Sequence, residues 1–226
     1  MNKIGTLQEN SLHASLKDWY QQPQDQLESS VDGYIIDLVR GNLLVEIQTR
    51  NFYSIKQKLA NLLERHPVRL VYPIPYEKWI LQLTSDGNTL IRRRKSPKRG
   101  KIIDIYQELI RFPRIVRHQN FTMEALMVRV EVVWRDDGKG SWRRKGKSII
   151  DQRLIEVVDS RIFSGLSDYQ STIPKDIPEL FTVRDLATVT HQPRRAAGKM
   201  AYCLREMGVL EAVGKRDRSI EYRLVP

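Results

Sequence analysis

Apolar and polar positions follow two different periods along the chain, and each period predicts a kind of element. Helical spacing of leucines and a tryptophan predicts a helix over residues 7–20, and a second apolar stripe predicts one over residues 52–65. Residues 31–49 instead hold two β-branched apolar runs around a turn at residues 40–42, which predicts a pair of strands.

Short apolar runs after the second helix predict more strands. Residues 68–73, 79–83 and 89–91 have this pattern, a helical stretch covers residues 102–110, and a further strand covers 127–134. The resulting order begins helix, strand, strand, helix, strand. The sequence therefore predicts an α/β fold with a mixed sheet.

The C-terminal residues have a pattern of their own. Residues 181–187 predict a short helix with Thr182 as N-cap, and a second helix runs from Pro193 to Met207 and stops at Gly208. Two short strands around a basic turn follow within residues 210–224. Two helices and a basic-tipped hairpin predict a winged helix-turn-helix.

The charge of the chain favours an anionic partner. The 226 residues include 38 Lys and Arg against 27 Asp and Glu, giving a net charge of +11. This excess favours nucleic acid, although a basic protein without such a partner has the same composition.

Cysteine content and hydropathy indicate the compartment. Cys203 is the single cysteine, so the chain can form neither an intramolecular disulfide nor a cysteine-based zinc site. It lies on a predicted helix, which favours a buried structural thiol. The N-terminus lacks the apolar run of a signal peptide, and no segment approaches the roughly 20 apolar residues of a membrane span. We expect a soluble, cytoplasmic protein with no membrane partner.

The predicted strand pair carries the candidate chemistry. Glu46 and Gln48 share one face of the second strand, because side chains alternate along a strand. In a twisted antiparallel pair, Asp32 at the start of the first strand is expected beside Glu46. Two converging carboxylates form an oxygen-rich site suited to Mg²⁺ or Mn²⁺.

Each acid also has a structural interpretation. Glu9 shares a helix face with Leu12 and Leu16, where a carboxylate is costly unless it is paired or binds metal, but it could also lie at the edge of that face or cap the helix. Asp32 could be a turn residue. Glu46 lies within a buried-type strand, where an unpaired acid is rare.

Residues 5–85 resemble the PD-(D/E)XK nuclease superfamily, which has the restriction endonuclease-like fold. In that family a helix supplies one acid, and a strand pair supplies Asp and then (D/E)-x-Lys. The matching positions here are Glu9, Asp32, Glu46 and Gln48, with Val31 in place of proline and Gln48 in place of lysine. The resemblance implies a catalytic set of these four residues and a Mg²⁺ or Mn²⁺ ion bound by Asp32, Glu46, Glu9 and the main-chain carbonyl of Ile47.

The missing lysine leaves alternatives open. Lys56 or Lys58 on the next helix could replace it, but a solvated helix face is the interpretation that we favour for both. Asp37 lies five positions from Asp32 and is therefore predicted to face the other side of the strand. Arg50 and Asn51 could contact the scissile phosphate, and Asn51 could equally begin the helix.

Basic side chains in three regions are predicted to contact DNA. Residues 92–101 and 139–147 read as basic loops that bind phosphates, and the second helix and turn of the C-terminal part would contact the duplex. Trp134 and Trp142 flank the second loop and are expected to pack across its hairpin rather than stack on bases. The predicted DNA-binding residues are Arg92, Arg93, Arg94, Lys95, Lys98, Arg99, Arg143, Arg144, Lys145, Gln192, Arg194, Arg195, Lys199, Arg216 and Arg218.

These patterns predict three domains and one leading function. Residues 1–91 form a nuclease-like core, 92–172 a basic helix and hairpin extension, and 173–226 the winged helix. The leading hypothesis is a Mg²⁺-dependent DNA endonuclease. Gln48 favours an alternative, a DNA-binding regulator or accessory subunit with an inactive nuclease fold, and a third interpretation is a binder of RNA or single strands. Cleavage of both DNA strands is compatible with a homodimer or a protein partner, although we recognise no dimerisation motif.

Overall fold

The computed structural model describes residues 11–225, which form two compact units. Within this range the first unit contains residues 11–25, 73–101 and 126–160, and the second contains 26–72, 102–125 and 161–225. Three long strands contribute residues to both units. Neither unit therefore coincides with a predicted domain, whose boundaries lie at residues 91 and 172.

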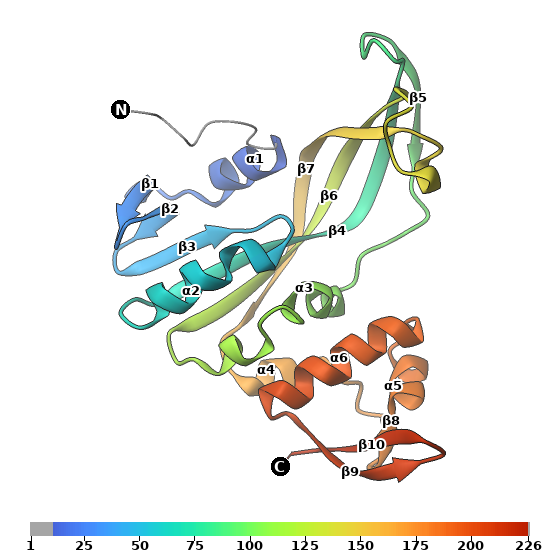
Figure 1. The fold of residues 1–226 in the computed structure, drawn as a ribbon. Helices are drawn as coiled ribbons and strands as arrows, with labels where there is room; N and C mark the ends of the chain where they lie inside the picture. Colours follow the sequence, from blue (N-terminus) through green and yellow to red (C-terminus); the bar gives the residue numbers. More distant parts are fainter. Residues whose placement is uncertain (1–10, 226) are drawn as a thin grey trace. The chain divides into compact units, whose positions relative to one another are not determined.

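The second unit begins with a strand meander and a helix (Figure 1). Strand β2 pairs antiparallel with both β1 and β3, whereas β3 pairs parallel with β4. A 3₁₀ turn, η1, leads into helix α2 between β3 and β4. The elements are β1 (Gln26–Val31), β2 (Tyr34–Arg40), β3 (Leu43–Ile47), η1 (Phe52–Ile55), α2 (Lys56–Leu63) and β4 (Val68–Leu83).

The first unit contains helix α1 and long antiparallel strands. The prediction of two strands over residues 68–83 is wrong, because β4 is continuous and accommodates Pro73 and Pro75, whose fixed φ is compatible with extended backbone. Residues 92–95 belong to a strand and not to a loop. The elements are α1 (Ser11–Tyr20), β5 (Leu90–Lys95), β6 (Phe121–Arg135), η4 (Trp142–Arg144) and β7 (Ser148–Phe163), with β4, β6 and β7 continuing into the second unit.

The long strands belong to one mixed sheet. The strand order is β1-β2-β3-β4-β6-β7, and β5 pairs with β4. This sheet confirms the predicted mixed α/β class. No helix of residues 11–225 has both the length and the apolar character needed to cross a membrane.

The remaining elements of the second unit include a small sheet in the order β8-β10-β9. Thr182 caps α5 as predicted, since its hydroxyl accepts from the amide of Arg184, and Gly208 ends α6 with a φ of 82° that favours glycine. These elements are η2 (Ile102–Ile105), α3 (Tyr106–Leu109), η3 (Pro113–Arg117), α4 (Leu166–Gln170), β8 (Phe181–Thr182), α5 (Val183–Val189), α6 (Arg194–Met207), β9 (Leu210–Arg216) and β10 (Ser219–Leu224).

Helix α6 buries its apolar side against α3 and α5 within the second unit. Cys203 is fully buried on this side, and its Sγ lies 3.9 Å from the main-chain oxygen of Tyr106. Burial raises the pKa of the Cys203 thiol to about 12. The predicted buried, structural thiol is therefore confirmed.

Candidate active site

Glu46 is a buried acid on β3, with 5% of its surface exposed. Lys58 of α2 places its Nζ 2.5 Å from Glu46 Oε1, an ion-pair distance, but at an angle outside that of a hydrogen bond. Burial is the largest influence on this carboxyl, and it raises the pKa of Glu46 to about 7 although Lys58 acts in the opposite direction. A buried carboxylate oxygen without a well-formed hydrogen bond is costly unless a cation balances it.

Asp37 lies beside Glu46, contrary to the prediction that it faces away. The β2–β3 register pairs Leu38 with Val45, so Asp37 and Glu46 follow as the next opposite pair. Asp37 Oδ2 accepts a 2.8 Å hydrogen bond from the amide of Ile47, and the charge of Asp37 also raises the pKa of Glu46. The second acid of the site therefore comes from the middle of β2.

Lys58 also differs from the sequence prediction. The helix pattern predicts a solvated position, but only 18% of its side chain is exposed. Besides its ion pair with Glu46, its ammonium donates to the main-chain oxygen of Ile35 on β2. Lys58 thus brings a positive charge from α2 to the two acids on β2 and β3.

Asp32 occupies the turn between β1 and β2 and does not join this group. Asp32 and Gly33 both have positive φ, 48° and 80°, which is typical of a two-residue hairpin turn. Asp32 Oδ2 lies 3.0 Å from His66 Nε2 and 3.9 Å from Arg65 Nη1. The β2–β3 register places Asp37, not Asp32, opposite Glu46, so the expected position of Asp32 beside Glu46 is wrong. Within residues 11–225 no three His, Cys, Asp or Glu side chains form a metal-binding group, and a metal-binding role for Asp32 stays a prediction.

Gln48 directs its amide nitrogen toward the loop after β3. Its Nε2 donates to the main-chain oxygens of Arg50 and Asn51, and it lies 3.4 Å from Ser54 Oγ. These contacts tie the loop that leads into α2, the helix that carries Lys58. A catalytic role for Gln48 stays a prediction, and a positioning role is what its contacts favour.

The other residues of the predicted core have mixed outcomes. Glu9 lies outside the described residues. Asn51 precedes η1 with a positive φ of 55° and makes no side-chain cap, and Arg50 is exposed. The metal-binding role of the Ile47 carbonyl stays a prediction of the family resemblance.

Asp37 and Glu46 are the residues that could hold a metal. Mg²⁺ is often bound by one or two carboxylates, with water and substrate phosphate oxygens as the other ligands. Two acids on neighbouring strands meet this requirement, and Lys58 alone does not offset the effect of burial on Glu46, whose pKa stays raised. The residues present therefore fit a Mg²⁺ or Mn²⁺ ion.

Most basic side chains of residues 92–101 already have partners within the first unit. Lys95 and Arg99 form ion pairs with the buried Glu77 at 2.7 and 3.0 Å, and the Lys95 hydrogen bond lowers the pKa of Glu77. Arg93 pairs with Glu131 at 2.8 Å. Residues 92–95 of the predicted phosphate-binding loop thus belong to a strand and residues 96–101 follow it, and the charges of the segment are partly neutralised, while Arg92 and Lys98 are exposed.

The second predicted basic loop exposes an aromatic side chain. Trp142 is 83% exposed, so the expected packing across the hairpin is wrong for this residue, whereas Trp134 is half-buried with the Arg94 guanidinium 5.9 Å from its ring. Arg144 donates to the main-chain oxygen of Lys147. Arg143 and Lys145 are exposed and remain candidates for phosphate contacts.

In the C-terminal elements, three predicted DNA-binding residues contact neighbouring side chains. Gln192 Nε2 lies 3.5 Å from Asp104 Oδ1, Lys199 donates to Gln107 at 2.9 Å, and Arg216 forms ion pairs with Asp185 and Glu221. Within the described residues, the exposed members of the predicted set here are Arg194, Arg195, Arg216 and Arg218, of which Arg216 is held in the ion pairs above.

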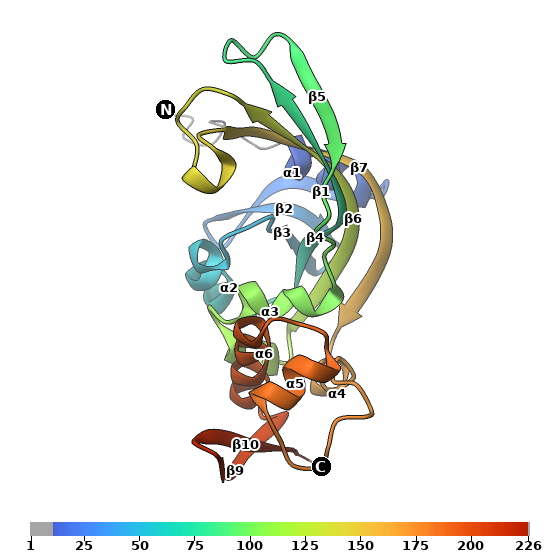
Figure 2. The ribbon, with the colours of Figure 1, turned by 90° about the vertical axis from the view of Figure 1, so that its right-hand side faces the viewer.

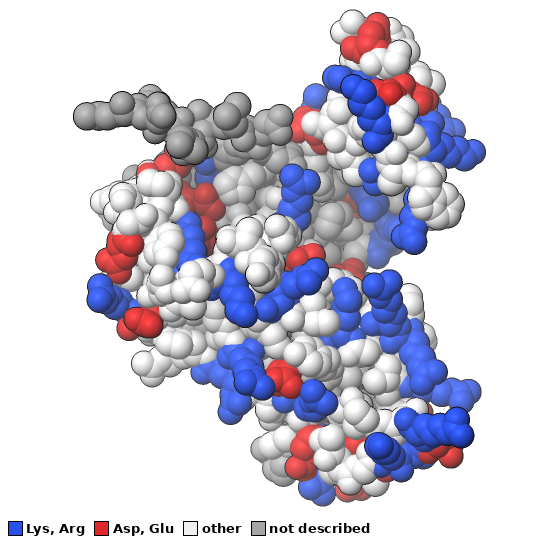
Figure 3. Space-filling view, viewed as in Figure 1, with Lys and Arg blue, Asp and Glu red and all other residues white. Residues whose placement is uncertain are grey.

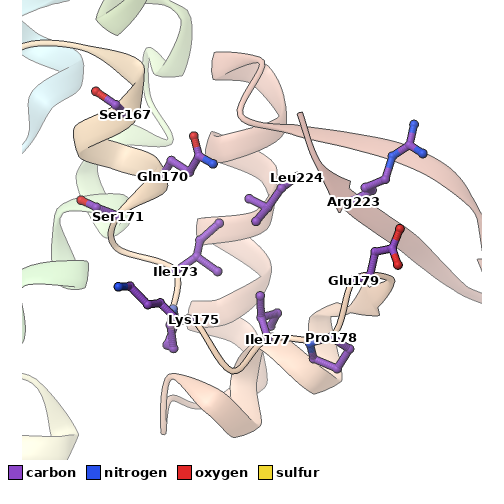
Figure 4. A pocket seen from close by; sticks show the side chains of 11 residues that line it. Ser167, Gln170, Ser171, Ile173, Lys175, Ile177, Pro178, Glu179, Arg223 and Leu224 are labelled. Carbon is purple, nitrogen blue, oxygen red and sulfur yellow. The ribbon is translucent and has the colours of Figure 1, made fainter. Parts of the chain in front are cut away.

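A pocket of about 600 Å³ lies between α4, residues 173–179 and β10 (Figure 4). Aliphatic side chains such as Ile173, Ile177 and Leu224 form much of its lining. It contains none of the residues that the sequence indicates for chemistry.

Comparisons with known proteins give a family and one relative. The family described as "Domain of unknown function (DUF8091)" matches residues 10–164. A protein of Treponema pallidum (strain Nichols), called "Uncharacterized protein", is 33% identical over 225 residues, which covers 99% of this chain and 88% of the relative. No solved structure matches the chain.

Proposed function

The chain belongs to the DUF8091 family, and from that premise we propose that it is a metal-dependent nuclease that hydrolyses phosphodiester bonds in DNA. The observation that carries the proposal is the convergence of Asp37, Glu46 and Lys58 from β2, β3 and α2. In the PD-(D/E)XK pattern a strand pair supplies Asp and then an acid, followed by lysine. Here the lysine comes from the next helix, and Asp37 takes the place that the sequence assigned to Asp32.

Each residue has a distinct task in this proposal. Asp37 and Glu46 hold the cation by their carboxylate oxygens. When bound, Mg²⁺ would polarise the scissile phosphate, lower the pKa of a bound water and stabilise the leaving oxygen. Lys58 adds positive charge next to the developing negative charge of the phosphate, and it can orient the attacking water.

The burial of Glu46 favours a functional role for its contact with Lys58 over the interpretation that the two form an ordinary surface ion pair. Exposed ion pairs are common and contribute little, whereas a buried acid that shares its surroundings with a second acid is energetically unfavourable. Groups held in this way often belong to functional sites, where bound metal or substrate balances the charge.

We propose that α5, α6 and the β9–β10 hairpin form a winged helix that grips the DNA. Lys and Arg side chains gather over these elements in the view of Figure 3. Arg194 and Arg195 at the start of α6 and Arg218 in the hairpin turn are exposed, as phosphate contacts require. The side of α6 that carries Lys199 packs on α3, so DNA contacts would come from the N-terminal end of the helix.

Cleavage of plasmid, linear and single-stranded DNA with Mg²⁺ or Mn²⁺ tests the proposal. We expect cutting by the wild type, no cutting in chelator, and losses of at least about 100-fold for Glu46→Ala and Lys58→Met. Lys56→Met is the matched control, because Lys56 is exposed on the same helix and its loss removes the same charge. Its activity should stay within a few-fold of wild type.

Other outcomes favour the second candidate function. If the wild type binds DNA but cuts none of these substrates with either metal, the chain is better described as a DNA-binding regulator or accessory subunit. Equal losses in Lys58→Met and Lys56→Met would show that general positive charge matters and would remove Lys58 from the site.

A further inference from the structure

Strand β7 (Ser148–Phe163) is an unusually exposed edge strand. It comes last in the strand order, and within residues 11–225 no other strand pairs with its outer edge (Figure 2). Aliphatic side chains on it are exposed, among them Ile150 at 42%, Ile155 at 45% and Ile162 at 44%. A long edge of this kind invites pairing with another strand, and proteins usually shield it.

The charges of β7 are arranged symmetrically about Glu156. Arg153 and Asp159 lie three positions before and after it, and Asp151 and Arg161 lie five positions before and after it. Each pair joins opposite charges. We infer that β7 pairs antiparallel with β7 of a second copy of this chain, with the two Glu156 residues facing each other at a two-fold axis.

Two-fold symmetry limits the possible registers. An antiparallel pair of identical strands must have one residue opposite itself, so the registers differ by shifts of two residues. With Glu156 on the axis, Arg153 faces Asp159 and Asp151 faces Arg161. The adjacent register on one side sets Asp151 against Asp159, and the one on the other side sets Arg153 against Arg161. Like charges directly opposite each other are destabilising, so Arg153, Asp159, Asp151 and Arg161 disfavour both adjacent registers.

The register with Glu156 on the axis also sets apolar side chains opposite one another. Ile150 faces Ile162, Leu154 faces Val158 and Ile155 faces Val157, so aliphatic groups meet on both faces of the paired strands. Pairing would remove exposed apolar surface from water, which stabilises association at about 25 cal/mol per Å² before the costs of binding.

The inner charges that would pair are accessible in one chain. Arg153 has 58% of its side chain exposed, and its contact at 2.9 Å is with Asp151 of the same strand. Asp159 is exposed and forms no ion pair with the described residues, although it accepts from the amide of Ser160. Arg161 contacts Asp168 and Ser171, and Asp151 has only 20% of its side chain exposed, so the outer pair is expected to contribute less than the inner pair.

Glu156 would meet its own copy at the axis, where like charges repel. Arg129 of the adjacent strand β6 forms an ion pair with Glu156 within the same chain, which offsets that repulsion. In the dimer, Arg153 and Arg161 of the two copies supply four positive charges, and Asp151 and Asp159 supply four negative charges. The charge of each Glu156 at the axis is balanced by Arg129 of its own chain.

Charge reversal at Arg153 and Asp159 tests this dimer without reference to any activity. The wild type should have twice the 26.5 kDa chain mass at micromolar concentration, by light scattering or sedimentation. Arg153→Asp sets acid against acid and Asp159→Arg sets base against base, so each variant alone should be monomeric. In an equimolar mixture of the two variants, every inner pair again joins opposite charges, and a heterodimer should form.

The matched control is Asp176→Arg, an equal charge reversal at an exposed site outside β7, which should stay dimeric. A monomeric wild type, dimeric single variants, or a mixture that stays monomeric would each overturn the inference. Glu156→Cys is an independent test, because a residue opposite itself has a Cα separation within disulfide range. Oxidation should link two copies of Glu156→Cys and not of Ile149→Cys, while Cys203 is buried.

Discussion

Burial decides the state of Glu46, because desolvation of its carboxylate outweighs the attraction of Lys58. In water an ion pair at this distance would keep the acid charged, but at 5% exposure the loss of hydration is larger. Asp37 adds a second negative charge and strengthens the effect. Below about pH 7 the Glu46 carboxyl of the free protein therefore holds a proton that a bound cation would displace, which couples metal binding to pH.

The raised pKa of Glu46 predicts how stability depends on pH. The ordinary value is 4.5 and the folded value about 7, so between these values the folded chain binds a proton that the unfolded chain has released. The free energy of unfolding then falls as pH rises through this window. Relative to Glu46→Gln, the wild type should lose about 3 kcal/mol between pH 4 and pH 8 in chelator, measured by denaturant unfolding. Parallel curves for the two proteins would contradict this assignment.

Replacing either aspartate by asparagine separates two assignments of the second acid. Asp37 contacts the backbone next to Glu46, whereas Asp32 contacts His66 in a turn. We expect Asp37→Asn to lower the cleavage rate by at least about 100-fold and Asp32→Asn to change it only a few-fold. A loss in Asp32→Asn with full activity in Asp37→Asn would restore the assignment made from sequence.

The sequence identifies Glu46 because an acid among buried aliphatic residues is a local signal. It does not identify Asp37, because the partner of Glu46 depends on register. A signal for Asp37 exists, since Asp37 lies four positions before Gly41 and Glu46 four positions after Asn42, the two residues of the turn. Lys58 is missed for another reason: whether a helical lysine faces solvent or a buried acid depends on how α2 packs, and the helix pattern alone does not give this.

At the scale of elements, helix α6 shows how packing divides a set of similar side chains. Arg194 and Arg195 are exposed at its start, while Lys199 is held by Gln107 of α3. The sequence predicts the bounds of α6 well, because Gly208 and Pro193 mark its ends. It does not predict which basic residues stay accessible, since Gln107 lies 92 positions before Lys199 in the chain.

This division predicts the salt dependence of DNA binding. The double variant Arg194→Gln/Arg195→Gln should weaken binding and reduce the slope of log affinity against log salt by about 2, one for each phosphate that is no longer neutralised. Lys199→Gln should leave the slope unchanged, because its ammonium is directed at Gln107. Fluorescence anisotropy over a salt series measures the affinity and the slope for each variant. An equal change of slope in the two variants would show that Lys199 also contacts phosphate, and would contradict binding through the N-terminal end of α6 alone.

At the scale of the whole molecule, three strands, β4, β6 and β7, contribute residues to both units. Composition and turn signals predict boundaries at residues 91 and 172 because local sequence changes character there. Pairing between strands distant in sequence overrides those signals. Strand β6 is buried on both of its faces for most of its length and neighbours both β4 and β7 in the sheet.

A fragment of residues 1–91 should therefore not fold, although it contains the whole predicted nuclease core. It would lack β6, which covers one edge of β4, together with the apolar side chains that β6 buries. Circular dichroism and dispersion of amide proton shifts measure the outcome, with the full chain as control. A dispersed spectrum from the fragment would show that β1 to β4 with α2 are sufficient.

The single thiol of this chain, Cys203, is unreactive while the protein is folded, because it is buried and its pKa lies far above neutral. A thiol of this kind can be alkylated only during moments when α6 parts from its neighbours. The rate at which Cys203 is alkylated therefore measures how often the C-terminal elements open locally. Because Cys203 does not react in the folded protein, a fluorescent or spin label can be attached selectively to one cysteine added on the surface.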